Sequence, residues 1–114
     1  MSRKRANANA VRFTEAAPLF AALGDETRLG VVARLCSEGP LSITALSADA
    51  KVTRQAITKH LHALSEAGLV RDRREGRERI WELEPRRVEL ARRCLDQISA
   101  QWDAALERLQ AIVE

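Results

Sequence analysis

A seven-residue repeat of apolar side chains near the C-terminus restricts the fold of this chain more than any other feature. Two series run at this period, offset by three positions: Val88, Leu95, Trp102 and Leu109, and Ala91, Ile98, Ala105 and Ile112. This is the a/d pattern of a helix that buries one stripe over more than three heptads. At about 1.5 Å per residue, such a helix would outreach a domain of this size. We therefore expect residues 85–114 to form a long helix.

Part of that apolar stripe needs a partner outside the domain, so we expect a homodimer. The residues expected at the dimer interface are Val88, Leu95, Ile98, Trp102 and Leu109. The alternative is that the stripe packs only on its own domain.

The composition fits one globular domain of 114 residues, because 46% of the side chains are hydrophobic and 31% are charged. No run of eighteen apolar residues is present, which argues against a membrane span. The start, Ser2-Arg3-Lys4-Arg5, is not followed by an apolar stretch as in a secretory signal. We therefore expect a cytoplasmic protein that does not bind membranes.

The positive charge of the chain is concentrated in two places. Residues 1–12 carry four cations and no acid, and residues 71–79 carry five arginines against three acids. The net charge is +3. Two basic patches favour a polyanionic partner, although a solvated surface gives the same balance. We interpret residues 1–12 as a basic mobile arm.

Capping residues divide the first two thirds of the chain into four expected helices. Gly24 ends the first, Asp25 caps the second before Gly39-Pro40, Ser42 caps the third, and Thr53 caps the fourth before Gly68. The expected helical ranges are 14–22, 28–36, 43–48 and 54–67.

The pattern then changes to that of two short strands, over residues 69–74 and 79–83. The four residues between them, 75–78, include Gly76 and predict a hairpin turn. Pro85 suits the first turn of the final helix. Five helices and a small β-hairpin in this order predict a mainly α, winged helix-turn-helix domain over 13–84, followed by a dimerisation helix over 85–114.

Three segments also resemble one family of proteins. Residues 23–29 (LGDETRL), 53–61 (TRQAITKHL) and 63–70 (ALSEAGLV), the last followed by 74–77 (REGR), are similar to segments of ArsR/SmtB-type transcriptional regulators. The resemblance covers about residues 16–83. The last helix, with Trp102 in a W-D-x-x-L-x-x-L setting, resembles a metal-independent branch of that family.

The expected fourth helix carries a polar face opposite Ala56, Ile57, Leu61 and Leu64. Arginine, glutamine, threonine and lysine are side chains that contact base edges and phosphates in DNA grooves. The DNA-binding residues expected on this helix are Thr53, Arg54, Gln55, Thr58, Lys59 and His62. His60 is expected to orient the helix or to contact a phosphate.

The hairpin is expected to act as the wing. Arg73 is expected to contact the DNA backbone, and Arg77, beside Gly76, to enter a minor groove, although a salt-bridged exposed hairpin is the alternative. The resemblance implies a regulator of transcription, acting as a repressor, that binds double-stranded DNA as a homodimer on an inverted repeat. A winged helix used only for protein–protein contact remains the rival interpretation.

Other functions lack the residues that they need. We expect no enzyme, because no nucleophile–base set and no phosphate-binding glycine loop is present. Metal sites in the family use cysteines of the third helix or Asp, Glu and His of the last; this chain has no cysteine in the former and no histidine in the latter. We therefore expect no metal and no cofactor, and the sequence does not identify an effector. Cys36 and Cys94 leave a redox- or sulfide-responsive repressor as an alternative to two inert thiols.

Overall fold

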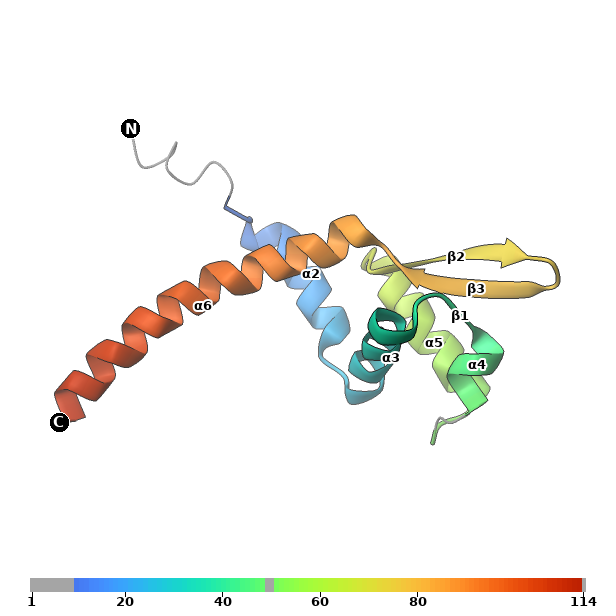
Figure 1. Cartoon of the computed structure of the whole chain (residues 1–114), viewed down its shortest axis with the longest axis horizontal. Coiled ribbons are helices and arrows are strands. Elements are labelled where there is room, and N and C mark those ends of the chain that lie inside the picture. Colours follow the sequence, from blue (N-terminus) through green and yellow to red (C-terminus); the bar gives the residue numbers. More distant parts are fainter. Residues whose placement is uncertain (1–9, 49–50, 114) are drawn as a thin grey trace.

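The computed structural model describes residues 10–48 and 51–113, which form five helices and a three-stranded antiparallel sheet (Figure 1). The elements are, in chain order, α2 (Phe13–Leu23), α3 (Glu26–Glu38), β1 (Leu41–Ser42), α4 (Ile43–Ala48), α5 (Arg54–Glu66), β2 (Val70–Glu75), β3 (Glu78–Leu83) and α6 (Pro85–Val113). The expected winged helix-turn-helix order is confirmed: α4 and α5 are the helix-turn-helix pair, and β2 and β3 are the wing.

Side-chain caps begin three of the helices, as expected. Asp25 accepts a hydrogen bond from the Arg28 amide at 3.0 Å, and Thr53 accepts one from the Ala56 amide at 3.1 Å. Ser42 does the same for the Ala45 amide at 3.1 Å. Each cap satisfies an amide that has no partner inside the helix. Glycines with positive φ, Gly39 at 84° and Gly68 at 83°, follow α3 and α5, where the backbone must turn left-handed.

The sheet corrects the expected hairpin in two ways. First, the turn contains two residues, Gly76 (φ 64°) and Arg77, because the strands continue until Glu75 pairs with Glu78. Second, β1 pairs with β3, which gives the strand order β1-β3-β2. A strand of two half-buried residues has no alternation that a sequence pattern could reveal.

The main core lies between the helices and the inner face of the sheet. Leu19 of α2, Leu35 of α3, and Leu61 and Leu64 of α5 are at most 3% exposed. Trp81 of β3 closes this core from the sheet side at 2% exposure. The inner face of α5 is thereby fixed on the body of the domain, and its other face is left outward.

A second, smaller core joins α2 to the first half of α6. Val11, Ala16 and Cys94 are buried there, and Val11 is held by both its amide (2.8 Å) and its carbonyl (3.2 Å) to the side chain of Gln97. The expected arm spans residues 1–12, of which 1–9 lie outside the described residues. Packing on α6 begins at Val11, before the expected boundary.

The second half of α6 extends away from the rest of the domain (Figure 1). Leu95, Trp102 and Leu109 are 51–62% exposed on it. Val88 and Ile98 differ, because they pack on the two cores of their own chain. The largely exposed part of the apolar stripe therefore begins at Leu95, and the set of residues that contact a second copy stays a prediction. None of the described helices is both long and apolar enough to cross a membrane.

Candidate DNA interface

The outward face of α5 carries a row of polar side chains with free hydrogen-bonding groups. Arg54, Gln55 and Lys59 are exposed, and they make no side-chain hydrogen bond or ion pair within the described part of the chain. The spacing along the helix, with His62 one turn further, places all four on one side. This face therefore presents donors and acceptors that water now solvates and that a ligand could use.

The two threonines expected on this face are used within the helix. The Thr53 hydroxyl oxygen accepts the capping hydrogen bond, and Thr58 donates its hydroxyl proton to the Arg54 carbonyl at 2.9 Å. Thr58 is also half-buried. Both residues lie on the expected face, but Thr58 retains only an acceptor for an outside group.

A polar link fixes the middle of α5 to the start of α3. The Arg28 guanidinium donates to Nδ1 of His60 at 3.2 Å and to the Ala22 carbonyl at 3.2 Å. The Asp25 carboxylate lies 3.8 Å from the same imidazole. The pKa of Asp25 is lowered, mainly by the hydrogen bond from the Arg28 amide and to a smaller extent by His60. His60 therefore links α5 to α3 through Arg28, and whether it also contacts a phosphate stays a prediction.

His62 lies near the aromatic side chain of the sheet core. Its ring centroid is 6.2 Å from that of Trp81, with the planes tilted by 53°. The indole N–H of Trp81 is buried without a hydrogen-bond partner among the described residues.

The wing carries a network of arginines and glutamates along one face. Arg73 is bound to Glu75 and, at 3.0 Å, to Glu82; Arg71 binds Glu82 at 2.9 Å and Glu84 at 2.7 Å. The hydrogen bond from Arg73, followed by that from Arg71, lowers the pKa of Glu82. Two carboxylates thus offset the positive charge of Arg73, the arginine expected to contact the DNA backbone.

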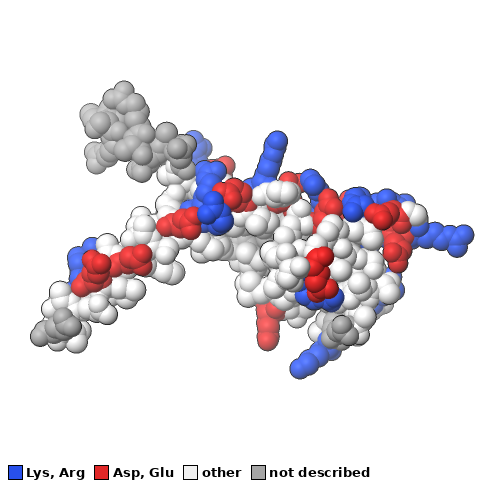
Figure 2. Space-filling view, in the orientation of Figure 1, with Lys and Arg blue, Asp and Glu red and all other residues white. Residues whose placement is uncertain are grey.

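Two other wing arginines have no such partner among the described residues. Arg77 at the turn and Arg74, across the ladder from Arg79, form no ion pair with a described residue, whereas Arg79 binds Asp72 at 2.8 Å. Figure 2 shows basic side chains projecting at the wing tip beside patches of both signs. The sequence did not predict that Arg74 is unpaired. Which wing arginines form ion pairs depends on the strand register, and the sequence pattern did not fix that register.

The two cysteines lie in different surroundings. Cys36 is exposed at the end of α3, and Cys94 is 1% exposed in the apolar cluster between α2 and α6. A thiol in apolar surroundings is a poor nucleophile. Within residues 10–48 and 51–113, no group of three or more His, Cys, Asp or Glu could hold a metal ion.

This arrangement defines a class of protein: a winged helix-turn-helix domain with an outward, unpaired polar face on its recognition helix. A family model described as a helix-turn-helix domain matches residues 23–73. HTH-type transcriptional regulator Rv2034 of Mycobacterium tuberculosis is 37% identical over 93 residues, which are 82% of this chain and 83% of that protein. The arsenical resistance operon repressor of Escherichia coli is 36% identical over 83% of this chain and 79% of its own.

A solved structure agrees with these relatives. An ArsR-like transcriptional regulator from Rhodococcus sp. RHA1 matches 90% of this chain and 95% of its own with a TM-score of 0.68 and 37% identity. The chain belongs to the ArsR family of transcriptional regulators and has the helix-turn-helix DNA-binding domain of that family.

Proposed function

We propose that this protein is a homodimeric repressor that binds a specific inverted-repeat operator in double-stranded DNA. The observation that carries the proposal is the face of α5. Arg54, Gln55 and Lys59 are free there, while caps and the Arg28–His60 link hold the helix itself in place. A rigid helix with unpaired donors and acceptors can enter a major groove at little conformational cost.

The proposed dimer rests on the open part of α6. Leu95, Trp102, Leu106 and Leu109 are each more than half exposed, along a helix that extends away from its own domain. Figure 2 shows this part of α6 as a largely uncharged surface below a row of charged side chains. An apolar stripe of this kind on an isolated helix is stabilised by pairing with the same stripe of a second copy.

The repressor role is proposed because the Escherichia coli relative is named as one. A dimer with two-fold symmetry places its two recognition helices on two half-sites in opposite orientation.

The experiment that tests the proposed function is selection of bound sequences from a random duplex pool. We expect enrichment of one inverted repeat, whose half-sites are spaced by about one helical turn, 34 Å, or a multiple of it. If the recovered sequences show no enrichment after several rounds, the proposed specific operator is contradicted. The protein would then be a nonspecific DNA-binding protein or a protein-binding module.

A further inference from the structure

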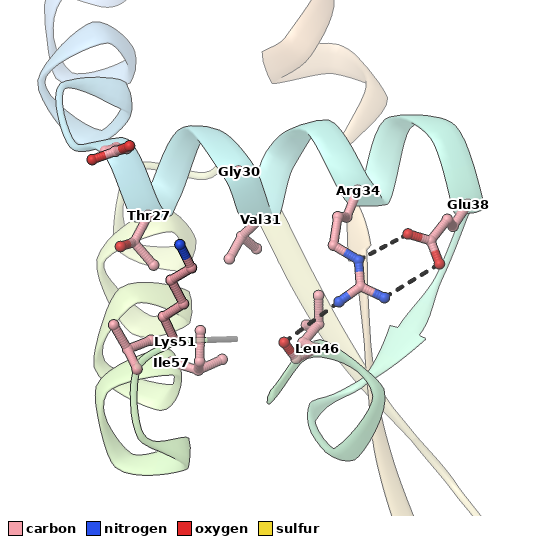
Figure 3. A pocket seen from close by; sticks show the side chains of 10 residues that line it. Thr27, Gly30, Val31, Arg34, Glu38, Leu46, Lys51 and Ile57 are labelled. Atoms are coloured by element: carbon pink, nitrogen blue, oxygen red, sulfur yellow. Dashed lines mark hydrogen bonds and ion pairs between the residues drawn. The ribbon is translucent and has the colours of Figure 1, made fainter. Parts of the chain in front are cut away.

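A hollow of about 730 Å³ lies between α3, α4 and the start of α5 (Figure 3). Its floor consists of one apolar side chain from each of these helices: Val31, Leu46 and Ile57, which are 1–5% exposed. Ile57 belongs to the inner face of α5, so the hollow lies behind the polar face described above. Its volume falls in the range of small-molecule sites.

Gly30, in the middle of α3, forms part of the wall, and nothing in the chain requires a glycine there. Its φ is not positive, since the glycines with positive φ are Gly39, Gly68 and Gly76. A Cβ atom added at Gly30 would meet no atom within 4 Å. Glycine is, after proline, the least favourable residue inside a helix. Because Gly30 lines the hollow and an added Cβ would meet open space, a large side chain at this position would take up part of the hollow.

The charges around the hollow are unequal at its two ends. Figure 3 shows Arg34 and Glu38 at one end, where the guanidinium binds the carboxylate at 2.8 Å and donates to the Ala45 carbonyl at 3.2 Å. At the other end, the Lys51 side chain extends toward Thr27 of α3. Lys51 forms no ion pair with a described residue.

Glu26 also lines the hollow and adds a negative charge to its lining. It lies in the first turn of α3. The helix dipole and the unpaired amides of that turn already stabilise its negative charge. The hollow thus combines an apolar floor with one ammonium group, one hydroxyl group and the Glu26 carboxylate, and of these three polar groups only Lys51 and Thr27 can donate a hydrogen bond to an anion.

We propose that this hollow binds a small organic carboxylate. Its apolar body would contact Val31, Leu46 and Ile57, and its carboxylate would bind Lys51 and Thr27. A body of about the size of an indole ring fits a volume in this range. No residue of the DNA interface is used in this contact.

The same ligand would act on DNA binding, and this part of the proposal rests on the proposed function. The hollow is bounded by α3 on one side and by both helices of the helix-turn-helix on the other. A ligand that prefers one position of α5 relative to α3 therefore changes the operator affinity, and the operator changes the ligand affinity by the same factor.

The binding experiment uses the full chain without DNA and three probes with the same indole body. Indole-3-acetate, indole-3-ethanol and tryptamine carry a carboxylate, a hydroxyl and an ammonium group. Titration is followed by methyl NMR of Val31, Leu46 and Ile57. We expect saturable shifts with indole-3-acetate, about two- to fivefold tighter than with indole-3-ethanol and weakest with tryptamine. No saturable shift of these methyl groups up to about 10 mM would overturn the site.

Four variants locate the probe. Gly30→Leu fills the hollow and should abolish the shifts, whereas Ala33→Leu, which adds the same side chain on the exposed side of α3, should leave them unchanged. If Gly30→Leu does not fold, Gly30→Ala, which meets no neighbour, should still weaken binding. Lys51→Met should remove the preference for the carboxylate and retain indole-3-ethanol. Binding that is indifferent to residue 30, or a preference for tryptamine, would contradict the proposal.

A separate experiment tests the effect of the ligand on DNA binding. With the selected operator, saturating indole-3-acetate should change the affinity by about fivefold or more, and Gly30→Leu should eliminate the change. Unchanged operator affinity with intact NMR binding would overturn the coupling alone. A protein that binds the probe and no operator would overturn the proposed function and leave the site.

Discussion

Gln55 is the side chain on α5 best suited to reading a base, because its amide donates and accepts at the same time. It is exposed and has no partner in the described chain. We expect Gln55→Ala to weaken binding to the selected operator by about 1–3 kcal/mol and to change binding to scrambled DNA little. Fluorescence anisotropy on both duplexes measures this. Lys59→Ala is the matched comparison, and it should weaken both complexes alike. Equal losses on both duplexes for Gln55→Ala would remove α5 as the reading element.

The wing arginines differ in how much of their charge is available. Arg77 and Arg74 are unpaired, whereas Arg73 is bound to two carboxylates. Arg77→Ala and Arg74→Ala should therefore each reduce the salt dependence of binding, by about one unit for each phosphate that the variant no longer neutralises. Arg73→Ala, which the sequence predicts to lose a contact with the DNA backbone, should reduce it less. Measurements at several salt concentrations decide, and a larger effect of Arg73→Ala would mean that its ion pairs break on DNA.

The pKa of Glu82 gives the wing a pH dependence of defined sign. Arg73 first and Arg71 second hold the pKa of this carboxyl group below its ordinary value of 4.5. The stabilisation is therefore complete above the ordinary pKa and is lost as the pH falls through the lower pKa of the folded state. Between about pH 6 and pH 3, the melting temperature should fall further for wild type than for Glu82→Gln. Parallel decreases, followed by circular dichroism, would show that the network adds no stability.

At the scale of elements, α6 is divided into a part that belongs to its own domain and a part that is open. Trp102→Glu places a charge in the open stripe, where an unpaired buried charge costs several kcal/mol. We expect this variant to sediment as a monomer at micromolar concentration, whereas wild type sediments as a dimer. Ala100→Glu, which puts the same charge on an exposed position outside the a/d stripe, should remain dimeric. A monomeric wild type would contradict the proposed dimer.

The helices could be predicted from the sequence because their ends depend on local chemistry. Asp25, Ser42 and Thr53 cap as expected, since a cap needs only the next three residues. Tertiary pairing was less accessible. The short β1, and the ion pairs that offset Arg73, depend on which residues lie opposite each other in the sheet.

The a/d pattern of α6 likewise predicted the helix without its division. The heptad does not distinguish Val88, which packs on its own domain, from Leu95, which remains open. The outward polar face of α5 could be predicted by elimination, because the buried residues of that helix define the opposite face. The hollow behind α5 could not be predicted from the sequence, because its walls come from three helices whose packing the pattern does not give.

At the scale of the whole molecule, the proposed dimer combines one reading helix per protomer with one long helix that pairs two protomers. Each protomer then contacts its own half-site, and the second contact is made at the high effective concentration set by the first. Operator affinity should therefore depend on the distance between the half-sites as well as on their sequence.

Half-site spacing is the most direct test of this dimer on its operator. An insertion of about five base pairs between the half-sites turns one of them to the opposite side of the helix, because a full turn takes about 10 base pairs. Electrophoretic or anisotropy titration should show a decrease in affinity of about a hundredfold or more, to the affinity of a single half-site. An affinity within about twofold of that for the selected operator would contradict a dimer in which the α5 helix of each protomer reads one half-site.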